Sequence, residues 1–202
     1  GYFNPEKTEV IYNFPKLSNY EELNLEAEKK YDLVFLGSAS KFIVNIMLEC
    51  TAGLKKEGYN VKSLMVRMLH FADSEEYVKR RMEELGLTQD DFILMDRLNT
   101  NDVPKYLVQC KIGLLPLDNT PKNANNIPTK LFEDMLCGLP VICSDLAPAR
   151  KFIGGEEVGY LVDYDDVSAY KEKIKLLLDN AELRQQLGNN GRKLVLEKYN
   201  WE

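Results

Sequence analysis

A proline-led helix in the second half of the chain carries a lysine and an acid at a spacing that could bind an anion. In "NNIPTKLFEDMLCGLPVICSD", Pro128 stands at the expected first helical position, with Lys130 and Glu133 following three residues apart. Proline lacks an N–H group, and the amides after it are free to point at an anion. An anion would also relieve the conflict between Lys130 and the helix dipole. On spacing alone, an exposed Lys130–Glu133 ion pair explains the same residues.

A second candidate loop, "LGSASK", follows an apolar segment near residue 37. Gly37 allows the backbone to approach a ligand, Ser38 and Ser40 offer hydroxyl groups, and Lys41 adds a positive charge. The dinucleotide fingerprint G-x-G-x-x-G is absent. The loop therefore fits either a phosphate contact or an ordinary turn.

Both loops belong to an alternation of short β-rich segments with helical patterns from residue 31 onward. The apolar segments are "YDLVFLG" (31–37), "VKSLMVR" (61–67), "DFILM" (91–95), "KIGLLPL" (111–117), "LPVICS" (139–144) and "VGYLV" (158–162). Strands that are apolar throughout and separated by helices indicate a parallel sheet covered on both faces. We predict an α/β fold, a Rossmann-like doubly wound parallel sheet of about six strands with helices on both faces.

The ends of the chain differ from this alternation. Residues 1–30 contain "VIYNFPKL" and an acidic helical stretch, which we interpret as a lead-in segment, so the predicted domain covers residues 31–202. After Val162 the pattern is helical in three segments, 166–180, 181–188 and 189–202, which should wrap the sheet.

Composition excludes several classes of function. A net charge of −6 argues against a nucleic-acid partner. The four cysteines form no C-x-x-C pair, so we expect buried, reduced thiols and a cytoplasmic location. No apolar run reaches the roughly 18 residues of a membrane span. With a single histidine, a triad hydrolase is disfavoured, and no pattern predicts a metal site or a resident cofactor.

Several motifs, taken together and in order, resemble one enzyme family. They are "VPKYLVQCKIGLLPL", "IPTKLFEDMLCGLPVICSD", "VGYLVDYDD" and "GNNGRKLVLEKYNWE". The second fits the pattern P-x-K-x-x-E-x-x-x-x-G-x-P-V-x of the retaining GT-B glycosyltransferases of group 1 (family 4 type). The resemblance covers nearly the whole chain and is to the C-terminal half, which binds the nucleotide-sugar donor.

The resemblance implies a role for each candidate residue. Glu133 would accept hydrogen bonds from the donor ribose, and Arg97 and Leu98 would lie against the base. The diphosphate would be bound by Gly37, Ser38, Lys41, Thr129, Lys130 and Leu131. The implied reaction is transfer of a sugar from a UDP- or GDP-sugar to a saccharide or lipid-linked acceptor, with retention and without a metal, in polysaccharide biosynthesis.

The chain also departs from the family pattern. The first of two family glutamates would fall at Asn125, so an amide of Asn125 or Asn126 would contact the donor sugar. Ser38 stands where a phosphate-binding arginine is common, and Ile43-Val44 stand where a basic residue and a glycine are expected. These departures keep open a second hypothesis, a glycosyltransferase-like module that binds nucleotide or protein after losing catalysis.

The family implies a further partner, an N-terminal acceptor domain of the same parent chain that supplies the catalytic groups. We therefore expect this chain to bind nucleotide weakly and not to transfer sugar alone, and the parent could touch a membrane peripherally through its acceptor. Two other classes are disfavoured. A receiver-type signalling domain needs clustered acids after the first strand, where the chain has Leu36-Gly37-Ser38, and an NAD-dependent oxidoreductase needs the missing glycine fingerprint.

Overall fold

The computed structural model describes residues 13–69, 71, 73–96, 98–155 and 157–201. Among these, six strands form one sheet in which every pairing is parallel. The strands are β1 (Tyr31–Ala39), β2 (Ser63–Leu69), β3 (Phe92–Met95), β4 (Cys110–Leu115), β5 (Val141–Ser144) and β6 (Gly159–Val162). The predicted Rossmann-like fold is confirmed, and each predicted apolar segment overlaps one of the six strands.

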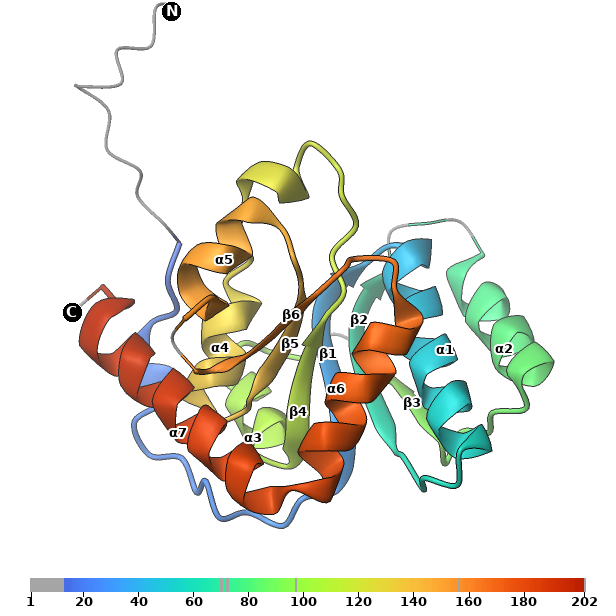
Figure 1. Ribbon diagram of the computed structural model, residues 1–202, viewed down its shortest axis with the longest axis horizontal. Coiled ribbons are helices and arrows are strands. Elements are labelled where there is room, and N and C mark those ends of the chain that lie inside the picture. Colours follow the sequence, from blue (N-terminus) through green and yellow to red (C-terminus); the bar gives the residue numbers. More distant parts are fainter. Residues whose placement is uncertain (1–12, 70, 72, 97, 156, 202) are drawn as a thin grey trace, which may run out of the picture.

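Helices and short 3-10 turns connect these strands (Figure 1). They are η2 (Leu17–Asn19), α1 (Lys41–Lys56), α2 (Ser74–Leu85), α3 (Val103–Leu107), η3 (Asn123–Asn125), α4 (Lys130–Leu136), α5 (Ala147–Ile153), α6 (Val167–Asp179) and α7 (Ala181–Lys198).

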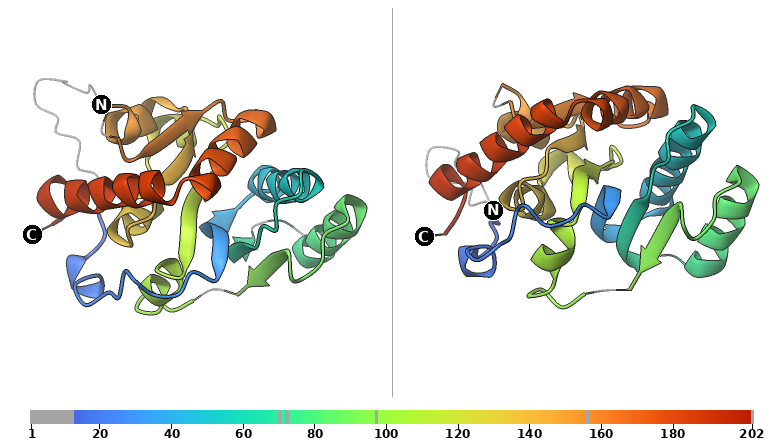
Figure 2. Two further views of the ribbon diagram at one scale, coloured as in Figure 1. Left: turned by 60° about the horizontal axis from the view of Figure 1, so that its bottom comes forward. Right: turned by 90° about the horizontal axis from the view of Figure 1, so that it is seen from below.

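The strand order is β3-β2-β1-β4-β5-β6, so the chain builds outward from β1 on one side and then from β4 on the other. Because parallel crossovers are right-handed, α1 and α2 cover one face of the sheet, and α4 and α5 cover the opposite face. α6 packs beside α1, and α7 packs along α4 (Figures 1 and 2). The strands are buried between these layers, as β5 is at all four positions.

The C-terminal helices differ in one respect from the sequence prediction. The two segments predicted at 181–188 and 189–202 form a single helix, α7. Gly188 lies inside this helix, where the backbone of α7 passes very close to the turn after α4. A Cβ atom at Gly188 would lie 2.0 Å from the carbonyl oxygen of Gly138. Only glycine allows α7 to approach the turn after α4 this closely.

The described part of the lead-in segment packs onto the domain, but its acidic stretch, predicted to be helical, forms turns and extended chain at residues 20–30. The Phe14 ring lies 5.1 Å from that of Phe132 and 5.8 Å from that of Tyr199, and Trp201 Nε1 donates a hydrogen bond to the Phe14 carbonyl at 2.8 Å. Tyr20 is buried in the main hydrophobic core. Both ends of the described chain therefore meet on α4 and α7.

Candidate functional site

A cleft opens at the carboxyl ends of β1 and β4, where the strand order reverses. Ligands of open α/β sheets bind at such a switch point. The cleft has a volume of about 450 Å³. Its lining comprises Ser38, Ala39, Ser40, Lys41, Ile43, Phe71, Leu117, Asp118, Thr120, Lys122, Asn123, Asn126, Pro128 and Lys130. The structure thus brings together Ser38, Lys41, Asn126 and Lys130 from the residues named on sequence grounds.

The first wall of the cleft is the turn from β1 into α1. Gly37 has a φ of +116°, which favours glycine. Ser40 caps the helix, accepting a hydrogen bond from the Ile43 amide at 3.4 Å. α1 has 16 residues and no acid in its first turn, so its positive dipole end faces the cleft without a competing carboxylate. The Lys41 ammonium lies 5.4 Å from the centre of the Phe71 ring.

Lys130 forms the opposite wall, and its ammonium is largely withdrawn from water. Its Nζ lies 4.2 Å from the centre of the Phe35 ring and 3.1 Å from where a Cβ on Gly37 would stand. Burial lowers the pKa of Lys130 to about 8, although Asp134 and Glu133 oppose the shift. An anion bound in the cleft would therefore interact with a nearby cation that is poorly hydrated.

Asp134 follows Lys130 by one turn of α4, lies against Gly113 of β4, and was not singled out from the sequence. It is 2% exposed, and no group among the described residues donates a hydrogen bond to its Oδ1. Burial and then the charge of Glu133 raise its pKa, while Lys130 opposes them. No local signal distinguishes it from Glu133, because an amphipathic helix commonly carries acids between apolar residues such as Phe132 and Met135.

Glu133 is placed differently from Lys130. Its Oε1 accepts a hydrogen bond from the hydroxyl of Tyr20 at 3.1 Å, and burial raises its pKa. Its side chain does not belong to the lining of the cleft. The exposed Lys130–Glu133 ion pair suggested by spacing does not describe these side chains, because one lies against Phe35 and the other against Tyr20.

The start of α4 lies two residues later than the sequence predicts, at Lys130. The Leu131 amide already donates to the Pro128 carbonyl at 3.1 Å, so it would have to exchange that bond to contact a diphosphate. Leu131's side chain is in the core. Thr129 Oγ1 accepts a hydrogen bond from the Asn13 amide at 3.1 Å.

The remaining candidates are spread around the cleft. Asn125 is exposed, and its side-chain amide donates to the Pro121 carbonyl at 3.1 Å, whereas Asn126 lines the cleft. Leu98 is half-buried against the core, and Arg97 falls outside the described residues.

Sequence reasoning missed the loop after β4, which supplies much of the cleft. Asp118 organises this loop, because its carboxylate and carbonyl oxygens accept from the amide of Asn123 and its carboxylate also accepts from Thr120 Oγ1 at 3.3 Å. Lys122 adds a cation to the lining. The polar run "DNTPKNANN" was visible, but its place beside the "LGSASK" loop requires the strand order.

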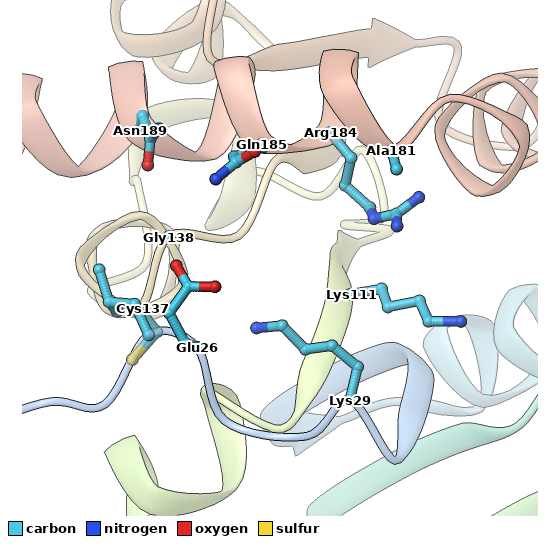
Figure 3. Close-up of a pocket in the computed structure, with 10 residues that line it drawn as sticks. Glu26, Lys29, Lys111, Cys137, Gly138, Ala181, Arg184, Gln185 and Asn189 are labelled. Atoms are coloured by element: carbon cyan, nitrogen blue, oxygen red, sulfur yellow. The ribbon is translucent and has the colours of Figure 1, made fainter.

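A second pocket, of about 260 Å³, lies near the start of β4 and contains three cations (Figure 3). Lys29 donates to the Val108 carbonyl at the end of α3 at 2.7 Å, and Arg184 donates to the carbonyl of Leu178 at the end of α6 at 3.3 Å. Lys111 pairs with Asp32 at 2.7 Å. Two of these cations neutralise helix C-termini and the third neutralises an acid, so their role is structural. The cleft at the carboxyl ends of the strands is therefore the better candidate for a ligand site.

The comparison with protein families decides the classification. The model of the glycosyl transferases group 1 matches residues 19–194. This chain belongs to that family.

Two named relatives match most of the chain. The chain is 24% identical over 192 residues to the capsular polysaccharide biosynthesis glycosyltransferase CapM of Staphylococcus aureus, covering 89% of this chain and 48% of CapM. It is 25% identical over 217 residues to the spore coat protein SA of Bacillus subtilis, covering 97% of this chain and 56% of that protein. The chain thus spans about half the length of the curated relatives it matches.

Solved structures of glycosyltransferases share the fold. The C-terminal domain of the group 1 protein LpcC from Francisella tularensis aligns with a TM-score of 0.70 at 17% identity, over 95% of this chain and 96% of that one. HepE of Anabaena, solved in complex with UDP-glucose, aligns with a TM-score of 0.76 at 17% identity, over 98% of this chain and 55% of HepE. The fold is therefore that of a group 1 C-terminal domain.

Within the described part of the chain, no three histidine, cysteine or acidic side chains gather in a way that could hold a metal ion. The helices described there include none long and apolar enough to cross a membrane. All four cysteines, Cys50, Cys110, Cys137 and Cys143, are buried with free thiols, as the sequence predicts.

Proposed function

We propose that this group 1 chain is the donor-binding half of a glycosyltransferase, with a nucleoside diphosphate sugar as its ligand. The observation that carries the proposal is the cleft at the switch point, where the capped N-terminus of α1 faces the desolvated ammonium of Lys130. Both favour a diphosphate, the first through backbone amides and the second through charge. HepE, a protein of like fold, was solved with UDP-glucose, which supports UDP as the first nucleotide to test.

The proposed reaction is transfer of the sugar with retention to a saccharide or lipid-linked acceptor. The role of this half is to stabilise the negative charge that develops on the departing diphosphate. Lys130, Lys41 and the amides at the start of α1 would do so, with no metal in the scheme. By the family pattern, Glu133 would contact the ribose, Leu98 the base and Asn126 the donor sugar.

The parent protein is proposed to act in polysaccharide biosynthesis, which the name of CapM supports. It would work in the cytoplasm, where the four free thiols stay reduced. An N-terminal acceptor domain would supply the remaining catalytic groups, and contact with a membrane would come through the acceptor.

One observation favours the second candidate function, a nucleotide-binding module without catalysis. Asn125 stands at the position of the first family glutamate, and its amide is turned to the carbonyl of Pro121 in its own loop. A neutral amide at that place cannot supply the negative charge of a carboxylate to the reacting sugar.

Calorimetric titration tests the proposal. The chain is titrated with UDP, GDP, their sugar conjugates and uridine, with Glu133→Ala as a binding-site control. Binding of a nucleoside diphosphate that weakens in the variant supports the donor-binding function, and its absence, or equal binding by the variant, rejects the assignment. Binding of UDP with no preference among sugars favours the non-catalytic module.

A further inference from the structure

Tyr20 makes an unusual contact for a residue of the lead-in segment. It is 2% exposed, yet its hydroxyl donates a hydrogen bond to Oε1 of Glu133, 113 positions away in the sequence, at 3.1 Å. Burial and then the charge of Glu133 raise the pKa of the phenol, so the hydroxyl keeps its proton and acts as the donor. The bond therefore joins a neutral donor to a carboxylate.

The position of Tyr20 is fixed from the other side by α7. Arg192 donates from Nη2 to the carbonyl of Tyr20 at 3.2 Å, and from Nη1 to the carbonyl of Leu136 in the last turn of α4. One guanidinium thus ties the backbone of Tyr20 to the helix that carries Glu133. The ring is enclosed in the core, which keeps the hydroxyl oxygen beside the carboxylate.

This arrangement leaves Glu133 with one oxygen fixed and one available. No group of the described residues donates a hydrogen bond to its Oε2. Burial raises the pKa of Glu133, whereas the Tyr20 hydroxyl and the charge of Lys130 lower it and so favour the ionised acceptor. An ordered carboxylate accepts a ligand hydroxyl at a smaller entropic cost than a mobile one.

We propose that Tyr20 is a positioning residue for ribose recognition, holding the Glu133 carboxylate in one orientation so that its second oxygen accepts a ribose hydroxyl. This inference rests on the proposed function, because it requires the ligand to carry a ribose. It assigns part of the donor site to the lead-in segment, outside the sheet and its helices.

The test measures preference for ribose. The full chain is titrated with UDP or GDP, whichever binds more tightly, and with the 2′-deoxy and 3′-deoxy forms of that nucleotide. We expect Tyr20→Phe to reduce the preference for ribose roughly tenfold, by the size of one hydrogen bond to a charged group, and to leave affinity for the less favoured deoxy form nearly unchanged. Glu133→Gln should reduce the preference at least as much, and the double variant should equal Glu133→Gln.

Tyr170→Phe is the matched control. Tyr170 is also fully buried, and its hydroxyl shares a hydrogen bond of 2.8 Å with Ser144, so this change removes the same group away from Glu133. Its ribose preference should equal that of the parent, and its melting temperature shows the cost of losing such a hydroxyl. If Tyr20→Phe does not fold, Arg192→Lys, which loosens the backbone of Tyr20, should lower the preference in its place.

The outcomes separate the inference from the function. If the parent prefers ribose and Glu133→Gln abolishes that preference while the folded Tyr20 or Arg192 variant keeps it, the positioning role is rejected and the proposed function stands. If the parent binds neither nucleotide, the proposed function and this inference fail together. Equal loss of affinity for the ribose and deoxy forms in Tyr20→Phe shows a structural role only and also rejects the inference.

Discussion

The ammonium of Lys130 lies 4.2 Å from the centre of the Phe35 ring and beside Gly37, two residues before the end of β1. The aromatic face and the missing Cβ of Gly37 together make room for a cation at the edge of the sheet. This contact joins the two loops that the sequence offered as separate candidates.

Replacing Lys130 by methionine tests the charge without removing the aliphatic chain. We expect the Kd for UDP to rise at least about tenfold, or ~1.4 kcal/mol, because a partly buried cation no longer meets the diphosphate. Uridine, which lacks phosphate, should bind the variant and the parent alike. Calorimetry on Lys193→Met, at a residue with a side chain 72% exposed on α7, provides the control and should reproduce the parent.

The pH dependence of UDP binding should follow Lys130. With a pKa of about 8, the free protein carries a charged Lys130 at pH 7 and a mostly neutral one at pH 8.5, so affinity should fall across that interval. Diphosphate ionisation is nearly complete by pH 7.5 and does not explain a fall above it. Lys130→Arg stays charged and should give a flat profile. A fall of the same size in that variant would assign the titration to another group.

Lys130 should make the folded chain more stable as pH rises, although the same rise makes UDP binding weaker. Its folded pKa lies below the ordinary lysine value of 10.5, so the unfolded chain binds more protons between pH 8 and 10.5. The contribution of Lys130 to the free energy of unfolding should therefore increase as pH rises through that window. Urea unfolding of the parent and of Lys130→Met at pH 7.5 and 9.5 checks this, and an equal pH response in both would contradict it.

Gly37→Ala should damage both stability and binding. At a φ of +116° the new side chain is strained, and its Cβ would stand 3.1 Å from Lys130 Nζ. We expect a loss of about 1–3 kcal/mol in the free energy of unfolding and weaker UDP binding as the lysine is displaced. Gly155→Ala is the comparison, because Gly155 has a φ of +90° and open space around the Cβ position. It should lose stability and keep UDP affinity.

Gly188→Ala should be among the most disruptive small changes in the chain. The added methyl group would stand 2.0 Å from the backbone oxygen of Gly138, which a side-chain rotation cannot relieve. We expect a loss of more than about 2 kcal/mol in urea unfolding. At Gly191 the nearest atom is the flexible Met135 side chain at 3.2 Å, so Gly191→Ala should cost clearly less. Equal losses would mean that α7 can shift away from α4.

The sequence predicts the sheet well because fully buried parallel strands are apolar at nearly every position, as in "LPVICS", where only the final serine of β5 is polar. The site is predicted only in part. Lys41 could be found from the sequence because it lies in a loop after a predicted strand. Lys130 could be found because it places a positive charge in the first turn of a predicted helix. Asp118 and Tyr20 could not be found in this way, because their places depend on strand order and on a contact 113 residues apart. Residues brought together by topology have no local pattern to reveal them.

The contact between Trp201 and Phe14 gives the domain a particular folding problem. Their hydrogen bond closes a loop of 187 residues, and the Tyr20–Glu133 bond closes another of 113. Such distant contacts carry a high entropic cost of loop closure and form late in folding. During synthesis, the sheet can assemble strand by strand, whereas Tyr20 reaches its final position only when Arg192 of α7 is available. The carboxylate proposed to recognise ribose would thus become ordered only after α7 has docked.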